Sequence, residues 1–286
     1  MTRPSTALRP PADPPTADPA FRLRGVRLGY GAEPVIDGLD LDVPRGRTTV
    51  LVGANGCGKS TLLRALGRQL APGAGTIEVG GRDLARIRPR EYARSVAFLP
   101  QSPLVPEGLT VAELVARGRH PHRRWWGGGS DADEAAVAEA LALTDTVGLA
   151  DRRVDELSGG QRQRAWIALV LAQATPTLLL DEPCSFLDLA HQLDVLDLVR
   201  RLPLPAGHGA GRRTVVAVLH ELTLAARVAD HLVAVEDGSV VAAGPPREVI
   251  TPDTLRRVFD LEADVLDDPV TGDPVVLPRA RRKDTA

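Results

Sequence analysis

The chain has 286 residues, a length that fits one large domain or two small domains. Its formal net charge is −2, and only 3% of its residues are aromatic. Neither a strongly basic surface nor a series of aromatic stacking platforms is indicated, so we expect no nucleic acid partner. The longest apolar run, residues 165–172, is far shorter than the roughly 18 residues that a membrane-spanning helix requires.

The two ends of the chain differ in composition from the rest. Residues 1–20 contain six prolines and no apolar core, which predicts a disordered tail and not a signal peptide. Residues 279–286 carry four basic side chains, namely Arg279, Arg281, Arg282 and Lys283. Four charges are few for attraction to anionic lipid, so we interpret this segment as a flexible, solvated basic tail. The cysteines Cys57 and Cys184 have no metal-ligand or redox spacing, which favours a reducing, cytosolic compartment.

In the first third of the chain, predicted strands surround one helix. Alternating apolar and polar side chains predict half-buried strands at residues 21–28 and 39–43. A short β-branched and apolar run predicts a buried strand at 48–52, directly before a glycine-rich loop. A helix is expected at 60–69, followed by strands at 76–79 and 95–99.

The middle of the chain has a helical pattern. Apolar periodicity predicts helices at residues 110–117, 131–147 and 158–174. The intervening residues 118–130 contain Trp125 and Trp126 among several glycines, as is typical of a loop. The two tryptophans fit equally well as packing residues or as an apolar patch for a partner.

The last third returns to alternating elements. Buried strands are predicted at 177–181 and 214–219, helices at 189–201 and 222–229, and a hairpin from residues 232–236 and 240–243. Residues 267–275 also have the composition of a hairpin turn. Alternation of strands and helices predicts an α/β fold with a parallel sheet and an inserted helical subdomain at about residues 102–160.

The glycine-rich loop matches the phosphate-binding pattern G-x4-G-K-S. Glycines let backbone N–H groups approach phosphate oxygens, and the following helix presents its N-terminus to the anion. Lys59 is expected to reach the β- and γ-phosphates of a nucleotide, and the Ser60 hydroxyl to coordinate Mg²⁺. The simplest interpretation of Cys57 is a small residue tolerated in a tight turn. The residues predicted to surround the phosphates are Gly53, Ala54, Asn55, Gly56, Cys57, Gly58, Lys59, Ser60 and Thr61.

Two carboxylates follow the buried strand at 177–181. In α/β sheets ligands bind at the carboxyl edge, where Asp181 and Glu182 are expected to lie. Asp181 can hold Mg²⁺ through water, and Glu182 can act as the general base towards an attacking water. A solvated acidic turn is the alternative, and the nearby glycine loop argues against it.

The segment Leu157-Ser158-Gly159-Gly160-Gln161 resembles the signature of the ATP-binding cassette (ABC) family. Further residues match the family's motifs in order: Tyr30 the aromatic residue that stacks on adenine, Gln101 the glutamine that contacts Mg²⁺ and the reacting water, Ser185-Phe186-Leu187-Asp188 the dimer-contact loop, and His220 the switch histidine that contacts the γ-phosphate. The resemblance covers residues 21–278. It implies an ATPase domain with a P-loop NTPase, RecA-like core, an antiparallel β subdomain and the inserted helical subdomain.

The residue types of the signature also predict a site for an anion. Ser158 is a good helix N-cap, and Gly159 and Gly160 expose backbone N–H groups to an anion, so Ser158 to Gln161 form a second anion site. The family resemblance implies a head-to-tail homodimer in which two ATP molecules are each sandwiched between one chain's glycine loop and the partner's signature.

Single residues in this set have simpler alternatives. Tyr30 alone fits a packing aromatic, Gln101 a surface glutamine, and His220 a capped or core histidine. Their places in the pattern favour function: Tyr30 on a strand before the glycine loop, and His220 between a buried strand and a helix. Glu221 replaces an aspartate that is common in the family, and Cys184-Ser185 stand where two threonines are frequent.

The chain's branch within the family is indicated by several stretches, among them 99–103, 115–121, 161–166, 186–192 and 220–226. They are similar to cassettes of the iron-siderophore and vitamin B12 importers. This resemblance implies polytopic permease subunits, an indirect link to a solute-binding protein, and a peripheral position at the cytoplasmic face of the membrane. Cobalamin and haem are alternative cargoes, and a cassette ATPase acting on DNA or ribosomes is the alternative from another class.

Overall fold

The computed structural model describes residues 18–31, 33–104, 107–123, 130–185 and 187–279. The predictions for the proline-rich tail up to residue 17, for Trp125 and Trp126, for Phe186 and for the basic residues after Arg279 lie outside this part of the chain. Ala20, which we assigned to the tail, is buried, and its backbone N–H donates to the carbonyl of Val43 at 2.8 Å. The folded part therefore includes Ala20.

A six-stranded sheet forms the centre of the molecule, with strand order β10-β9-β3-β8-β7-β6. Neighbouring strands are parallel except β10, which runs antiparallel to β9. Their bounds are β3 Thr48–Val52, β6 Val96–Leu99, β7 Thr177–Asp181, β8 Thr214–Val218, β9 His231–Glu236 and β10 Ser239–Gly244. The predicted buried strands are confirmed.

These strands separate two hydrophobic cores. Side chains of a strand alternate between its two faces, so Val50 and Val52 enter one core and Leu51 enters the other. In β7, Leu178 and Leu180 likewise face the first core while Leu179 faces the second. Burial on both faces explains why these strands are continuous apolar runs in the sequence.

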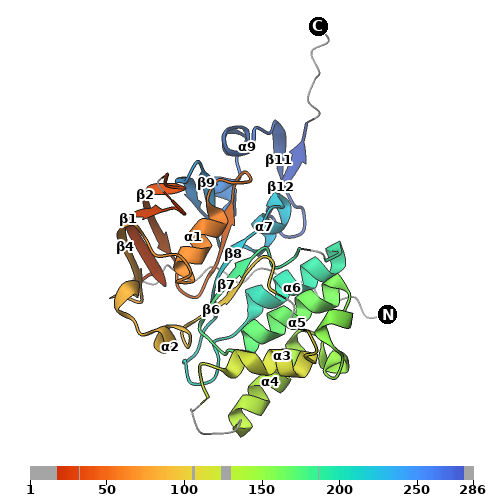
Figure 1. Ribbon diagram of the computed structural model, residues 1–286. Helices are drawn as coiled ribbons and strands as arrows, with labels where there is room; N and C mark the ends of the chain where they lie inside the picture. Colours follow the sequence, from red (N-terminus) through yellow and green to blue (C-terminus); the bar gives the residue numbers. More distant parts are fainter. Residues whose placement is uncertain (1–17, 32, 105–106, 124–129, 186, 280–286) are drawn as a thin grey trace.

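A second, antiparallel sheet has the strand order β2-β1-β4-β5. It consists of β1 Phe21–Leu28, β2 Ile36–Val43, β4 Ala74–Val79 and β5 Arg82–Asp83. The strand β2 begins three residues before the predicted start, because Gly38 takes a φ of +71° that interrupts the alternating pattern without ending the strand. Helix α1, Lys59–Leu66, contacts β1, β7 and β8 and lies between the two sheets (Figure 1).

The predicted helical segment forms a group of helices beside the sheet, at the lower right of Figure 1. It includes α3 Val111–Ala116, α4 Asp131–Leu143 and α5 Gly159–Ala172. The helix predicted for 131–147 is too long: the Thr144 hydroxyl donates to the carbonyl of Ala140, and Asp145 takes a left-handed φ of +51°. The helix predicted for 60–69 ends early for a similar reason, because Arg68 has a φ of +58°.

Among the remaining elements, the helices predicted at 189–201 and 222–229 are confirmed, the latter ending one residue earlier. The others are short or C-terminal, and several of them gave no clear sequence pattern. The hairpin of β11 and β12 confirms the turn predicted around residues 267–275. Within the described residues, no helix is long and apolar enough to cross a membrane.

The bounds of these remaining elements are η1 Leu84–Arg86, α2 Pro89–Tyr92, η2 Arg117–Arg119, η3 Val147–Leu149, η4 Val154–Glu156, α6 Leu189–Arg201, α7 Leu222–Val228, α8 Pro246–Val249, α9 Pro252–Phe259, β11 Ala263–Asp267 and β12 Pro274–Pro278.

A buried ion pair ties the helical group together. Arg119 and Asp133 are each 7% exposed, and the Arg119 Nε donates to an Asp133 carboxylate oxygen at 2.8 Å. Arg119 also donates to the carbonyl of Ala172 at 2.8 Å, which connects the start of α4 with the end of α5. Burial raises the pKa of Asp133, but hydrogen bonds from Arg119 and Ser130 outweigh it and lower the pKa to about 2.

We expect Asp133→Asn to lower the free energy of unfolding by about 3 kcal/mol, because Arg119 is left as a buried, unpaired cation. Asp145→Asn is the control: that carboxylate is 96% exposed in its pair with Arg164, and its loss should cost at most about 1 kcal/mol. Urea unfolding followed by circular dichroism measures both. Since the pKa of Asp133 is lowered, its contribution should persist above the usual value of 3.8 and disappear as the pH falls towards 2. Equal costs for the two variants would contradict the assignment.

Candidate active site

The glycine loop links the end of β3 to the start of α1. Three of its glycines have φ angles that favour glycine: +153° at Gly53, +82° at Gly56 and +106° at Gly58. A Cβ on Gly53 would lie 2.2 Å from the carbonyl oxygen of Val235. Glycine is therefore required here by both backbone conformation and close packing, and the loop wraps around a cradle that faces the N-terminus of α1.

Lys59 is folded over this cradle. Its Nζ donates to the carbonyls of Gly53 at 2.9 Å and Ala54 at 2.8 Å, and it lies 3.6 Å from the Cys57 sulfur. The side chain is buried, at 5% exposure, and no carboxylate is among these partners. Carbonyl oxygens hold an ammonium group less strongly than an anion does. The cation is thus placed where a phosphate would bind, with partners that a phosphate can displace.

Ser60 and Asp181 meet at the start of α1. The Ser60 hydroxyl donates to Asp181 Oδ1 at 2.9 Å, while Oδ2 is buried without a hydrogen-bond partner. Burial raises the pKa of Asp181 above its ordinary value, against the effect of the Ser60 hydrogen bond. Hydroxyl and carboxylate oxygens are the donors that Mg²⁺ prefers. The unpartnered oxygen and this donor pair fit a magnesium ion, bound directly or through water.

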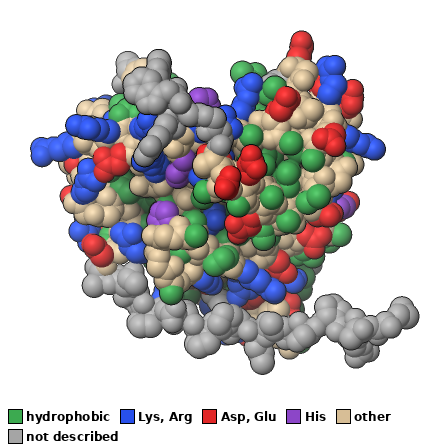
Figure 2. Space-filling view, turned by 90° about the horizontal axis from the view of Figure 1, so that it is seen from below, with side chains coloured by type: hydrophobic (Ala, Val, Ile, Leu, Met, Phe, Trp, Pro, Cys, Tyr) green, Lys and Arg blue, Asp and Glu red, His purple; other side chains and the backbone are tan. Residues whose placement is uncertain are grey.

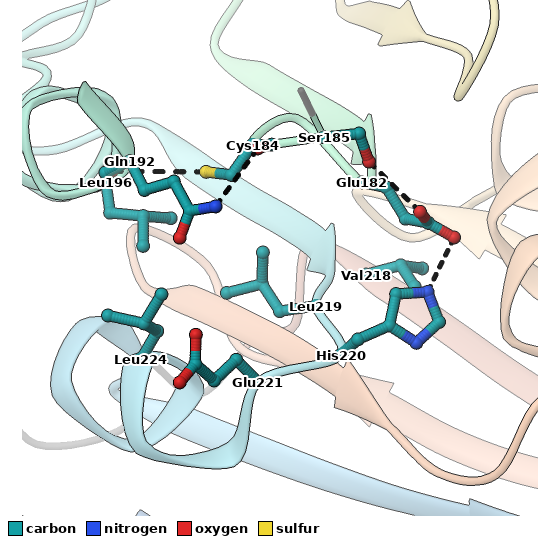
Figure 3. A pocket seen from close by; sticks show the side chains of 10 residues that line it. All are labelled: Glu182, Cys184, Ser185, Gln192, Leu196, Val218, Leu219, His220, Glu221 and Leu224. Atoms are coloured by element: carbon teal, nitrogen blue, oxygen red, sulfur yellow. Dashed lines mark hydrogen bonds and ion pairs between the residues drawn. The ribbon is translucent and has the colours of Figure 1, made fainter. Parts of the chain in front are cut away.

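Glu182 lies at the centre of a cluster of polar groups, shown in Figure 3. His220 Nε2 is 2.6 Å from Glu182 Oε1, and the Ser185 hydroxyl donates to Oε2 at 3.1 Å. Gln101 also lies close enough to this carboxylate to lower its pKa. Partial burial raises the pKa of Glu182, but these hydrogen bonds outweigh it and bring the pKa below its ordinary value. The carboxylate is therefore ionised at neutral pH, with a φ of +51° that marks a strained backbone.

Ser185 was missed as a member of this cluster. The sequence places it in the predicted dimer-contact loop, three residues after Glu182. A serine at this spacing can close a hydrogen bond back to a preceding carboxylate, and this spacing was the available signal. The neighbouring Cys184 points away from the carboxylate towards α6, as Figure 3 shows. Burial raises the pKa of the Cys184 thiol to about 12, so this thiol is not reactive at neutral pH.

Tyr30 does not lie where the sequence pattern indicated. It follows β1 by two residues and is not part of a strand, and the strand directly before the glycine loop is β3. Its side chain is exposed at 62%, and its hydroxyl accepts a hydrogen bond of 3.0 Å from Arg64 on α1. This contact holds the ring near the helix that begins at the loop, and the high exposure leaves ring surface free to stack.

The signature residues form the N-terminus of α5. Ser158 is the N-cap, and its hydroxyl accepts a hydrogen bond of 3.3 Å from the backbone N–H of Gln161. The Gln161 side chain in turn accepts a 3.2 Å bond from the N–H of Ser158, which completes a capping box. Gly159 and Gly160 start the helix. In Figure 1, α5 lies in the helical group, apart from α1, so these residues and the glycine loop are separate anion-binding ends.

The arrangement therefore places a cation, a hydroxyl–carboxylate pair that could hold Mg²⁺, and an ionised carboxylate at one edge of the sheet. Gln101, Glu182 and His220 follow β6, β7 and β8, three neighbouring parallel strands. Their side chains converge at the carboxyl ends of these strands, beside the loop that follows β3. Such a site can bind a nucleoside triphosphate and activate water towards its terminal phosphate.

We expect Lys59→Ala to weaken ATP binding about a hundredfold, since a charged hydrogen bond to phosphate is worth up to about 3 kcal/mol. Titration with a fluorescent ATP analogue and phosphate release measure the effect. Because the Lys59 ammonium group bonds to two carbonyls and one sulfur and to no carboxylate among the described residues, the melting temperature should change little. Unchanged affinity and turnover would refute the phosphate-binding role of Lys59.

Known proteins match this chain along most of its length. The family model described as "ABC transporter" matches residues 36–185. The "Probable siderophore transport system ATP-binding protein YusV" of Bacillus subtilis is 49% identical over 262 residues, with 92% of this chain and 94% of that protein covered. The ferric enterobactin transport ATP-binding protein FepC of Escherichia coli is 45% identical, with 91% and 95% covered.

The fold matches solved structures as well. A dimeric bacterial ABC transporter cassette superposes with a TM-score of 0.69 at 26% identity, and the match covers 79% of this chain and 99% of that one. The central sheet, the glycine loop and the helical group described above are thus those of an ABC cassette. The chain belongs to the ABC transporter family, as the cassette that binds and hydrolyses ATP.

Proposed function

We propose that this chain is the ATPase subunit of an importer that takes up ferric siderophores through a separate membrane permease. The observation that carries the ATPase part is the convergence of Gln101, Glu182 and His220 beside the glycine loop. The siderophore part is supported by relatives that are named for siderophore and ferric enterobactin transport and that align over most of their length. Cobalamin and haem are the alternative cargoes.

In this proposal, ATP binds with its phosphates in the loop from Gly53 to Thr61 and its adenine against Tyr30. Lys59 leaves its two carbonyl partners for the β- and γ-phosphates. Ser60, Gln101 and, through water, Asp181 would hold Mg²⁺, which would neutralise phosphate charge. The unpartnered Oδ2 of Asp181 supports this assignment, because a buried carboxylate oxygen without a donor is costly unless a cation or water satisfies it.

Glu182 is proposed as the general base. Its carboxylate is ionised and can take a proton from a water aligned with the γ-phosphate. His220 and Ser185 fix the orientation of the carboxylate through bonds of 2.6 and 3.1 Å. When ATP is present, we expect His220 to hydrogen-bond to the γ-phosphate as well as to Glu182. Loss of the γ-phosphate would then change the hydrogen bonding of Glu182.

The proposed working unit is a homodimer that sandwiches two ATP molecules. The glycine loop and the signature lie in separate parts of the fold. In the proposed dimer, a second copy therefore supplies Ser158, Gly159, Gly160 and Gln161. The capping box engages the Ser158 oxygen as an acceptor, which leaves its O–H free to donate to phosphate. The likeness to a dimeric cassette supports this arrangement.

We assign permease docking to the helical subdomain at about residues 102–160 of an ATPase domain spanning 21–278. A groove between α3 and α4 is lined by apolar and charged side chains, namely Ala112, Ala116, Val137, Ala138, Leu141, Glu113, Arg123, Asp133 and Glu134. Figure 2 views the molecule from this end and shows hydrophobic side chains gathered over the helical side. Such a groove suits a permease helix, which would hold the chain at the cytoplasmic face of the membrane. A solute-binding protein would deliver the cargo to the permease.

Glu182→Gln should trap an ATP-bound dimer. The amide keeps the size of the side chain but cannot take a proton, so binding persists while hydrolysis falls by at least about a hundredfold. Size-exclusion chromatography in MgATP measures the assembly. Glu139→Gln, an exposed change on α4, is the matched control and should hydrolyse ATP as the wild type does. A Glu182→Gln chain that stays monomeric in saturating MgATP would contradict the sandwich.

The cargo is tested by uptake in a strain that lacks this gene. We expect uptake of radiolabelled iron–siderophore complexes to be lost and to return with the wild-type chain but not with Glu182→Gln. Parallel assays with cobalamin and haem separate the alternatives. Normal siderophore uptake in the deletion strain would remove the siderophore assignment and leave the ATPase activity untouched.

A further inference from the structure

One buried polar side chain joins the signature helix to the loop that carries the proposed base. Gln163 lies in α5, five residues after Ser158, and is 5% exposed. Its Nε2 donates to the carbonyl of Pro183 at 2.8 Å. Buried amides are placed where they have a defined partner, because an unsatisfied one is costly. The partner here is the residue directly after Glu182.

The backbone around Glu182 needs external support. Glu182 has a φ of +51°, in the left-handed region that non-glycine residues rarely take. Within the loop, the backbone N–H of Ser185 donates to the Glu182 carbonyl at 3.2 Å. Pro183 has no N–H, so its carbonyl is the only backbone group through which this residue can be fixed by a hydrogen bond. Gln163 provides that bond from α5.

The far end of the same loop is held by α6. Gln192 donates to the carbonyl of Leu187 at 3.0 Å and to that of Cys184 at 3.4 Å. Figure 3 shows Gln192 and Cys184 on one side of a pocket and the Ser185, Glu182 and His220 cluster on the other. The loop is thus clamped between two helices, and the clamp on the side of Glu182 comes from the signature helix.

We propose that Gln163 is a positioning residue that couples the two ATP sites of the dimer. The inference rests on the proposed sandwich dimer, in which the N-terminus of α5 contacts the ATP held by the partner copy. Glu182 of the same chain serves the other ATP. Gln163 therefore connects an event at one nucleotide with the base that acts on the other.

The distances make this coupling direct. Gln163 lies about 6 Å along the helix axis from Gly159, four residues at about 1.5 Å each. A helix of 14 residues moves as a rigid element on this scale. When phosphate engages Ser158 and the helix shifts, the hydrogen bond transmits the shift to Pro183 and so to the orientation of Glu182. A chain whose partner site is empty keeps Glu182 in a less productive orientation.

Gln163→Met tests the proposal, because methionine keeps the length and bulk of the side chain but removes the amide donor. The matched control is Gln173→Met at the other end of α5, where the amide also donates to backbone carbonyls, at 2.6 Å to Ala93 and 3.3 Å to Val96. For the full-length wild type and both variants, we would measure the melting temperature, the affinity for a fluorescent ATP analogue, and the dependence of hydrolysis on ATP concentration.

We expect the wild type to hydrolyse ATP with a Hill coefficient above 1, up to the limit of 2 that two sites set. Gln163→Met should bind ATP within about twofold of the wild type, with kcat reduced about tenfold and a Hill coefficient near 1. Gln173→Met should keep the cooperativity of the wild type. A merely structural role of Gln163 would change the melting temperature without removing cooperativity.

Two outcomes would overturn the inference. One is a Gln163→Met chain as cooperative as the wild type, and the other is a wild type with a Hill coefficient of 1 although it dimerises in ATP. Failure of the proposed function would give a different result. A wild-type chain that never dimerises in MgATP would refute the sandwich dimer itself.

Discussion

The structure depends on one geometric constraint: four neighbouring parallel strands end at the same edge of a sheet that is buried on both faces. The residues that follow β3, β6, β7 and β8 are the glycine loop, Gln101, Glu182 and His220. Because the strands themselves are held by two hydrophobic cores, their ends are fixed relative to one another. Loops that leave such an edge can carry polar and strained groups at defined distances, which a catalytic site requires.

The polar contacts at this edge determine the charge state of the site. Asp181 is more buried, holds one oxygen without a donor and has a raised pKa, so it is suited to a cation. Glu182 is surrounded by donors and has a lowered pKa, so it remains ionised, as the base proposed above must be. Two adjacent carboxylates thus have opposite pKa shifts because their surroundings differ. The loop beyond them is clamped by Gln163 of α5 and Gln192 of α6, which connects the site to both helices.

Much of this could be predicted from the sequence, because the buried strands are continuous apolar runs and the loop and signature are short, local patterns. Features that depend on tertiary contacts could not. The early ends of α1 and α4 are set by Arg68 and Asp145, two non-glycine residues whose left-handed backbone the sequence does not indicate. The pairing of Arg119 with Asp133 joins a predicted loop to a helix start. The placement of Tyr30 on a strand was wrong, because β1 ends at Leu28, two residues before Tyr30. The domain boundaries and the roles of the site residues remain predictions.

The central claim is that each ATP is held by two copies of the chain. The most direct measurement is a crystal structure of the Glu182→Gln variant with MgATP. We expect each γ-phosphate to contact Lys59 of one copy and Ser158 of the other, with Gln163 still bonded to Pro183. A structure in which each nucleotide is enclosed by residues of a single copy, with Ser158 of the partner away from the phosphate, would contradict it.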